Sequence, residues 1–247
     1  MLDRNAVKGS CRLCCEVREL RDSHILPSWM YDHARRGPDG YQPGLAFLDG
    51  KTGKAVLMTK HVTEHLLCGE CEQRLGDWDA HLSKLLVQAD GSFPWLADLE
   101  IGSSRADQDA VIRFAYSVVW RGSVCTKLPA NLGAYERSFA EYLLTPDRPP
   151  PTNTSLRVHL ITDQGLQRLL EQPNARRRGG YHGHRFTGCG AMFELCVGRT
   201  IPEAFRKTCY VRERFIHRAD REVIVALYGS LITGTVATGK LAKLDLK

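Results

Sequence analysis

The sequence predicts an α+β fold, with a zinc-stapled module and helices first and a mainly β part after them. Two C-x-x-C pairs lie in the first third of the chain, apolar residues recur at helical spacing up to Leu144, and apolar residues alternate from Ser155 onward. A segment with four prolines separates these patterns, and proline ends helices. We therefore predict a zinc module with helices at residues 1–145, a linker at 146–154 and a mainly β domain at 155–247.

The N-terminal part is expected to contain one hairpin and three helices. Two apolar runs around a glycine-containing turn predict a hairpin over Leu45–Lys60, and the glycines and prolines of Arg35–Gly44 predict a loop before it. Apolar side chains at steps of three and four predict helices over Glu72–Val87, Ala106–Val124 and Tyr135–Leu144. Asp107 and Asp109 favour the N-terminus of the second helix.

The part after the linker is expected to be mostly strand. Ser155–Thr162 alternates between apolar and polar residues and predicts a strand, followed by a short helix over Asp163–Glu171. The arginine- and glycine-rich segment Asn174–Gly190 is expected to be a loop. Apolar and β-branched runs predict three more strands, over Ala191–Gly198, Thr208–Phe215 and Arg221–Gly229.

The composition excludes several classes of protein. The 247 residues are 43% hydrophobic and 25% charged, as in ordinary globular proteins, and no apolar run approaches the ~20 residues that a membrane helix needs. The N-terminus lacks the apolar core of a signal peptide. We therefore expect a soluble, cytoplasmic protein without a membrane partner. The nine cysteines, an odd number, then argue against a disulfide framework, because cytosolic thiols stay reduced.

The charge is unevenly distributed along the chain. Residues 1–100 carry 12 basic and 15 acidic groups, a net charge of −3, whereas residues 101–247 carry 22 and 13, a net charge of +9. A basic surplus favours contact with a polyanion such as nucleic acid, and it is equally compatible with a soluble surface.

The two C-x-x-C pairs, Cys11/Cys14 and Cys68/Cys71, predict one zinc site. A two-residue spacer lets both thiolates of a turn face one ion, and four thiolates complete a closed, structural site. A cysteine turn, a hairpin and a second pair that opens a helix follow one another in treble-clef order. The alternatives are a redox-active dithiol and plain core thiols, and Cys15 is expected to be spare.

Between the two pairs, residues 23–27 read S-H-I-L-P, and residues 66–72 read L-L-C-G-E-C-E. This order of motifs resembles the HNH, or ββα-metal, nucleases that carry a structural zinc. It is more similar still to a group of uncharacterised bacterial proteins with an S-H-I-I-P core and an L-L-C-x-x-C-E continuation. The resemblance covers about residues 8–82, a third of the chain.

The resemblance implies a metal-dependent endonuclease that hydrolyses phosphodiester bonds in DNA, in phage defence or a mobile element. His24 takes the position of the general base that activates water, and a catalytic Mg or Mn ion is implied beside it. Ser23 stands where the family has an Asp ligand, and Glu72 stands where it has a His or Asn ligand. Serine is a poorer ligand than a carboxylate. The family's middle Asn has no clear counterpart; three residues lie near its place, His61, Thr63 and Glu64.

Other interpretations of these residues stay open. His24 would, in a purely structural role, bond a carbonyl and hold the hairpin, and Glu72 would stabilise the positive end of a helix. The chain would then be a catalytically inactive, zinc-stabilised module that binds nucleic acid or a protein. A protein partner subunit that completes the pocket is also compatible with the sequence.

The most basic segment provides candidate nucleic-acid contacts. Arginines suit phosphate oxygens, glycines allow close backbone approach, and an aromatic ring can stack on a base. The candidate residues are Arg176, Arg177, Arg178, Tyr181 and Arg185. The alternative is a solvated loop. His182 and His184 form an H-x-H pair, which is a weak indication of a second metal site.

Overall fold

A computed structural model describes residues 7–37, 40–41, 45–49, 54–58, 60–87, 101, 104–224 and 226 of the chain. Its N-terminal part is built from three strands and one long helix: β1 (Val7–Ser10), β2 (Val17–His24), β7 (Thr63–Cys68) and α2 (Gly69–Leu86). Shorter elements lie between β2 and β7, namely α1 (Ser28–Arg35), β3 (Arg36–Gly37), β4 (Gly40–Tyr41), β5 (Leu45–Asp49) and β6 (Lys54–Met58).

Two helices lead from this part to a five-stranded sheet. They are α3 (Arg105–Val124) and α4 (Glu136–Leu144), the latter preceded by a 3₁₀ turn at Gly133–Tyr135. The sheet strands are β8 (Thr154–Ile161), β9 (Glu171–Arg178), β10 (Tyr181–Gly188), β11 (Ala191–Gly198) and β12 (Ile216–Ala219). A 3₁₀ turn at Gln164–Leu166 and the short helices α5 (Glu203–Lys207) and α6 (Tyr210–Glu213) complete the order.

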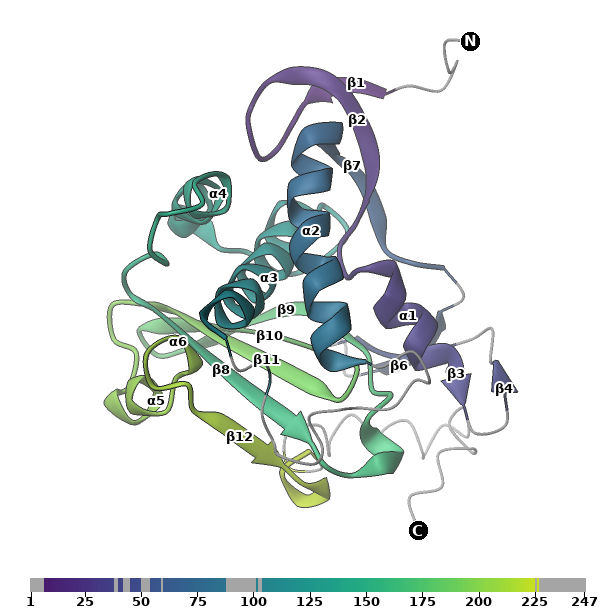
Figure 1. Ribbon diagram of the computed structural model, residues 1–247, viewed down its shortest axis with the longest axis vertical. Coiled ribbons are helices and arrows are strands. Elements are labelled where there is room, and N and C mark those ends of the chain that lie inside the picture. Colours follow the sequence, from purple (N-terminus) through teal and green to yellow (C-terminus); the bar gives the residue numbers. More distant parts are fainter. Residues whose placement is uncertain are drawn as a thin grey trace.

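The elements are stacked along the long axis of the molecule (Figure 1). β1, β2 and β7 form an antiparallel sheet at one end, with α2 packed against β2 and β7. At the other end the order is β12-β8-β11-β10-β9, a mixed sheet in which β12 alone runs parallel to its neighbour, β8. Helix α3 contacts both α2 and the five-stranded sheet, so it connects the two ends. The fold is therefore α+β, as predicted.

The predicted helices are confirmed, with small shifts at their ends. α2 begins at Gly69, three residues before the predicted start, so Cys71 lies in its first turn. α3 begins with a capping box, in which the Ser104 side chain accepts a bond from the Asp107 backbone and Asp107 accepts one from the Ser104 backbone. Every residue of α3 from Ala110 to Gly122 is buried, because α2, α4 and the sheet surround it.

The prediction of a loop over Asn174–Gly190 is wrong. β9 and β10 form an antiparallel hairpin there, turning at Gly179, whose φ of +60° favours glycine. The strands were not recognisable because their buried positions are polar. Arg185 and Glu171 form a bidentate ion pair with Nε–Oε2 and Nη2–Oε1 distances of 3.0 Å, and the Asn174 amide donates to Glu171. A buried polar network of this kind has no apolar alternation to detect.

Two predicted strands near the C-terminus are also wrong. Within Thr208–Phe215 the chain forms α6, and only Cys209 and Tyr210 are buried, so the segment lacks the burial pattern of a strand. Within Arg221–Gly229, residues 221–224 are helical, because the Asp220 carboxylate accepts a bond from the Val223 N–H and caps a helical turn. Residues 225 and 227–229 lie outside the described part.

The remaining predictions are confirmed in full or in part. The strands over Ser155–Thr162 and Ala191–Gly198 are confirmed as β8 and β11, and β5 pairs with β6 as the predicted hairpin. The short helix predicted over Asp163–Glu171 is reduced to one 3₁₀ turn. Residues Arg35–Gly44 contain the β3–β4 pair, and residues 38, 39 and 42–44 lie outside the described part.

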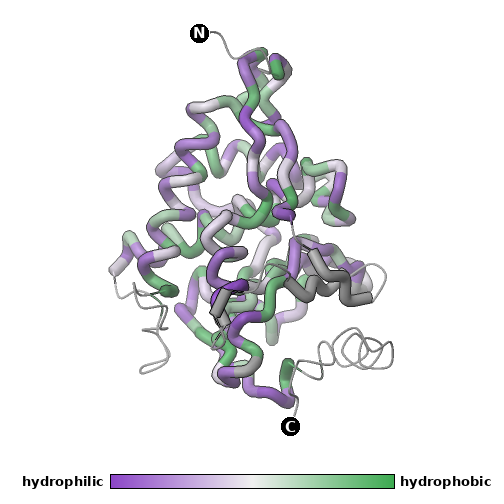
Figure 2. Tube along the Cα trace, turned by 90° about the vertical axis from the view of Figure 1, so that its right-hand side faces the viewer, coloured by the Kyte–Doolittle hydropathy of each residue, from purple (hydrophilic) through white to green (hydrophobic). Residues whose placement is uncertain are grey.

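One hydrophobic core runs through both predicted domains. Phe114 of α3 meets Phe186 and Phe193 of the sheet edge to face, at centroid distances of 5.9 and 5.6 Å. Trp29 of α1 lies 6.4 Å from the same ring, and the Gln172 amide of β9 donates to the Tyr31 hydroxyl. Hydrophilic and hydrophobic residues alternate along the coloured parts of the trace in Figure 2. The division of the chain at residues 146–154 stays a prediction, and the packing across it is continuous.

Three histidines with buried or largely buried side chains make stability depend on pH. Burial lowers the pKa of His33 and of His184 to about 4 and that of His159 to about 3. As the pH falls through about 6.5, these histidines bind protons in the unfolded chain but stay neutral in the folded chain. The free energy of unfolding therefore falls as the pH falls. Between pH 7.5 and 5.5 we expect a loss of about 1.4 kcal/mol per histidine in urea unfolding. His184 is fully buried, so leucine can replace it without exposing an apolar side chain. Since one of the three histidines is then gone, His184→Leu is expected to remove one third of this loss of stability. An unchanged dependence of the unfolding free energy on pH would contradict the role given to His184.

Candidate functional site

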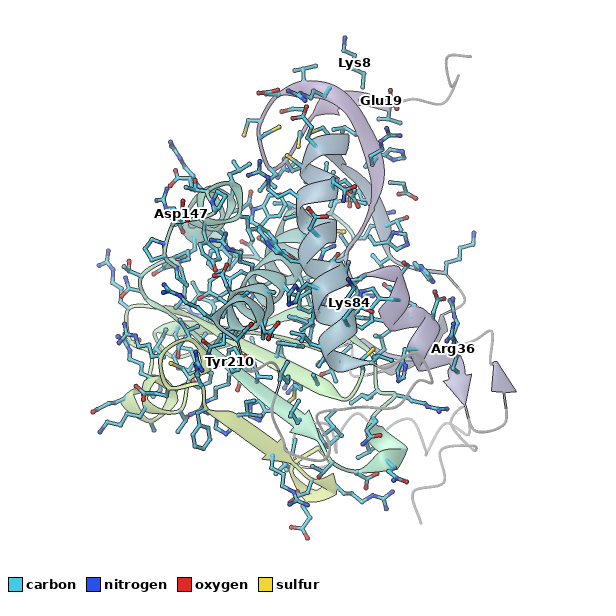
Figure 3. All side chains as sticks on the ribbon, viewed as in Figure 1. Lys8, Glu19, Arg36, Lys84, Asp147 and Tyr210 are labelled. Atoms are coloured by element: carbon cyan, nitrogen blue, oxygen red, sulfur yellow. The ribbon has the colours of Figure 1, made fainter. Side chains whose placement is uncertain are left out.

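Four cysteines from separate segments meet at the end of the N-terminal sheet. Cys11 and Cys14 lie in the turn between β1 and β2, Cys68 ends β7, and Cys71 lies in the first turn of α2. Their sulfur atoms all lie within 4.8 Å of one another. Figure 3 shows sulfur atoms gathered between the β1–β2 turn and the first turn of α2. The cluster can hold a metal ion such as zinc, as predicted.

The geometry of the cluster suits a closed site. The sulfurs of Cys14 and Cys68 are 3.9 Å apart, close to the roughly 3.8 Å between ligands of a tetrahedral ion with metal–sulfur bonds of about 2.3 Å. The Cys68 N–H donates to the Cys11 sulfur at 3.3 Å. Burial and the neighbouring Cys11 raise the pKa of Cys71, so a cation is needed to keep four thiolates together. The adjacent Cys15 is exposed and does not belong to the cluster.

Ser23 and Glu72 meet beside this cluster. Ser23 is fully buried near the end of β2, where β7 pairs with it, and Glu72 follows Cys71 in α2. The Ser23 hydroxyl donates to Oε2 of Glu72 at 2.6 Å. Within the described part of the chain, the other oxygen of Glu72 has no hydrogen-bond partner. The two residues at the implied ligand positions are therefore in direct contact, although 49 positions separate them.

Helix α3 fixes the backbone at the end of β2. Arg121 donates to both carboxylate oxygens of Asp79, at 3.0 and 2.9 Å, and to the carbonyl of His24 at 3.1 Å. Burial raises the pKa of Asp79, whereas the Arg121 guanidinium lowers it; Glu72 and His24 also lie within electrostatic range of this carboxylate. The pair Arg121–Asp79 thus ties α2, α3 and the His24 backbone together.

The His24 ring belongs to a second hydrogen-bonded chain. Its Nε2 lies 3.0 Å from Nδ1 of His61, and Nε2 of His61 lies 3.0 Å from Nη1 of Arg35. Tyr31 stacks on His61, with ring centroids 4.2 Å apart and planes 11° from parallel. Burial, with the charges of His24 and Arg35, lowers the pKa of His61. Of the residues near the place of the missing Asn, His61 is the one that bonds to the His24 ring.

The other two candidates for that place have different contacts. The Thr63 carbonyl accepts a bond from Lys127, and Thr63 faces His24 only as its partner in the β2–β7 register. The Glu64 carboxylate accepts bonds from the thiol of Cys125 and from Thr126. These bonds lower the pKa of Glu64, although burial opposes them. Both residues therefore hold β7 to the chain after α3.

The five candidate nucleic-acid residues do not form one exposed surface. Arg176 and Arg177 are exposed on β9, whereas Arg185 is buried in its ion pair with Glu171. Tyr181 is half-buried and packs against a small cluster that includes Ile201 and Phe205. The side chain of Arg178 lies outside the described part. The histidines His182 and His184 join no group of three candidate ligands among the described residues.

Two members of the site were missed from the sequence. In the sequence, Arg35 is one charged residue at the edge of a predicted loop, and Tyr31 is one of several aromatic residues. Neither position indicates a contact with His61. Their partner His61 lies 26 positions after Arg35, so no spacing rule connects them. Only the fold brings the three together.

Comparisons with known proteins supply no assignment. No protein-family model matches the chain, and neither a curated protein nor a solved structure matches it. Among the described helices, none combines the length and apolar character needed to span a bilayer. The function must therefore be inferred from the residues themselves.

Proposed function

We propose that this chain is a zinc-stapled, metal-dependent nuclease of the HNH type, which hydrolyses phosphodiester bonds in DNA. The observation that carries the proposal is the bond between Ser23 and Glu72. It joins the two positions where the resemblance expects metal ligands, next to the candidate base His24. The order β2, β7, α2 supports it, because two antiparallel strands followed at once by a helix is a ββα arrangement.

The four cysteines are assigned a structural zinc ion. The closed set of sulfur ligands leaves no position for substrate, so the ion stabilises the fold rather than the reaction. The cysteine turn, the two strands and the helix that starts at the second pair fit a treble clef. This site joins the β1–β2 turn to the end of β7 and the first turn of α2, and it thereby helps to position Ser23 of β2 against Glu72.

A separate Mg or Mn ion would bind the carboxylate oxygen of Glu72 that does not accept the bond from Ser23. Such ions prefer oxygen ligands and are commonly held by one or two carboxylates, with water and substrate phosphate completing the shell. Glu72 offers a carboxylate oxygen, and Ser23 orients that carboxylate and offers its hydroxyl oxygen. When bound, the ion would stabilise negative charge on the scissile phosphate. His24 is assigned the role of general base, with its backbone fixed by Arg121.

A second candidate function is a zinc-stabilised binding module without catalysis. Two observations favour it. Apart from the four cysteines, no three candidate ligands converge among the described residues. In that same part of the chain, no hydrogen bond joins the His24 ring to Glu72. The same protein would then retard nucleic acid without cutting it, and binding through Arg176 and Arg177 would weaken steeply with salt.

The His24→Ala variant separates the two candidate functions. If His24 is the general base, nicking of supercoiled plasmid in added Mg or Mn is expected to fall about 100- to 10,000-fold. Loss of the imidazole should leave zinc content and thermal stability close to those of the wild type. The matched control is His65→Ala, because His65 is an exposed histidine on β7. Equal nicking by both variants would remove His24 from the reaction.

A further inference from the structure

The hydrogen-bonded chain from Arg35 to His24 has only one consistent arrangement of hydrogens. Arg35 ends α1 and is buried, His61 precedes β7, and His24 ends β2. A guanidinium carries donors only and keeps its charge in proteins. Nε2 of His61 must therefore accept the hydrogen from Nη1 of Arg35. In a neutral His61 ring the remaining hydrogen then lies on Nδ1.

The same reasoning passes to the next ring. Nδ1–H of His61 points at Nε2 of His24, 3.0 Å away, so that nitrogen must accept. A neutral His24 consequently carries its hydrogen on Nδ1. The opposite tautomer of His24 would turn two N–H groups toward each other. Tyr31 packs flat on His61 and keeps the ring from turning out of this line.

We propose that Arg35, acting through His61, locks His24 in the tautomer that bears its hydrogen on Nδ1. Within the described residues, Nδ1 of His24 has no hydrogen-bond partner, so it is the ring nitrogen left for a substrate or a water. A general base needs a lone pair at that nitrogen. The consequence for catalysis rests on the proposed function: Arg35 is an inhibitory positioning residue, and His24 becomes a base only when Arg35 leaves His61.

The lock is tested first without any assay of activity. Long-range ¹H–¹⁵N correlation spectra of the full, zinc-loaded chain at pH 8 report which nitrogen of each neutral histidine carries the hydrogen. We expect Nδ1–H for both His24 and His61. A hydrogen on Nε2 of His24 would overturn the proposal, whether or not the protein cuts DNA.

Three variants distinguish the lock from simple packing. Arg35→Lys keeps a charged donor and should retain the wild-type pattern. Arg35→Met removes the donor and should shift His24 toward the Nε2–H tautomer. His61→Phe should cause the same shift while keeping an aromatic ring on Tyr31, and it serves if the Met variant fails to fold. An unchanged His24 signal in Arg35→Met or His61→Phe would contradict the lock.

Plasmid nicking by the same samples tests the consequence for catalysis. Arg35→Met is expected to nick several-fold faster than wild type in added Mg, and Arg35→Lys at the wild-type rate. Equal rates for wild type and Arg35→Met would refute the inhibitory role. No nicking by any of these proteins would refute the nuclease proposal, and the spectra would still decide the tautomer.

Discussion

Replacement of Cys71 by serine is expected to remove the bound metal and unfold the N-terminal module. Cys71 is one of four sulfurs within 4.8 Å of one another, and three of the four cysteines are buried. Apparent binding free energies for structural zinc are about 10–16 kcal/mol, and this energy is also folding energy. Zinc per chain should fall from one to near zero by elemental analysis, and the thermal unfolding midpoint should drop sharply.

The neighbouring Cys15 offers a matched control for this experiment. It is exposed, follows Cys14 directly and lies outside the cluster. Cys15→Ser should therefore keep one zinc per chain and the wild-type unfolding midpoint. If Cys71→Ser also kept its zinc and its stability, the four-cysteine site would be wrong. Loss of zinc from Cys15→Ser instead would place the ligand set one residue further along.

The second large effect is expected at the ion pair between α2 and α3. Asp79→Ala leaves the Arg121 guanidinium buried, with its side chain 3% exposed, and without its counter-charge. Breaking a buried pair in this way costs about 3–5 kcal/mol. The variant should lose that much free energy of unfolding in urea. It also removes the carboxylate that holds the Arg121 guanidinium in place where Arg121 bonds the His24 carbonyl.

Asp77 lies on the same helix two residues earlier and provides the control. Within the described part of the chain its one hydrogen-bond partner is Gln73 at the surface, so Asp77→Ala should change the free energy of unfolding by less than about 0.5 kcal/mol. The double variant Asp79→Leu/Arg121→Met removes both charges and should recover part of the loss. Equal stability of Asp79→Ala and Asp77→Ala would show that the pair does not hold the helices.

The parts of the fold that were predictable follow local rules. The spacing of the cysteines predicts a common metal site whatever the intervening chain does, and the structure brings the four sulfurs together. Helix α3 was predictable because its apolar residues recur at steps of three and four and Asp107 favours its N-terminus, where it completes the capping box with Ser104. These signals need no knowledge of distant residues, and the structure reproduces them to within one to three positions.

The parts that were not predictable depend on distant partners. β9 and β10 bury Glu171, Asn174 and Arg185 against one another, so their sequence looks like that of a solvated loop. These polar residues could be recognised as buried only after the pairing of β9 with β10 was known. In the same way, nothing near Arg35 in the sequence indicates that His61 receives its hydrogen bond.

For the candidate site, the motif order predicted Ser23, His24 and Glu72, and the contact between Ser23 and Glu72 is a finding of the structure. The resemblance could not predict the contacts of His24, because the middle Asn has no clear counterpart in this sequence. The structure shows that the His24 ring meets His61, which in turn is bonded by Arg35. Where the sequence departs from the motif, the contacts of the residues had to come from the structure.

The most direct test of the nuclease proposal is nicking of supercoiled plasmid by wild-type protein that carries one zinc per chain. We expect nicking that requires added Mg or Mn and stops when that ion is chelated, while the zinc stays bound. Retention of the plasmid in a protein complex, with no nicked product at any concentration of either ion, would contradict it.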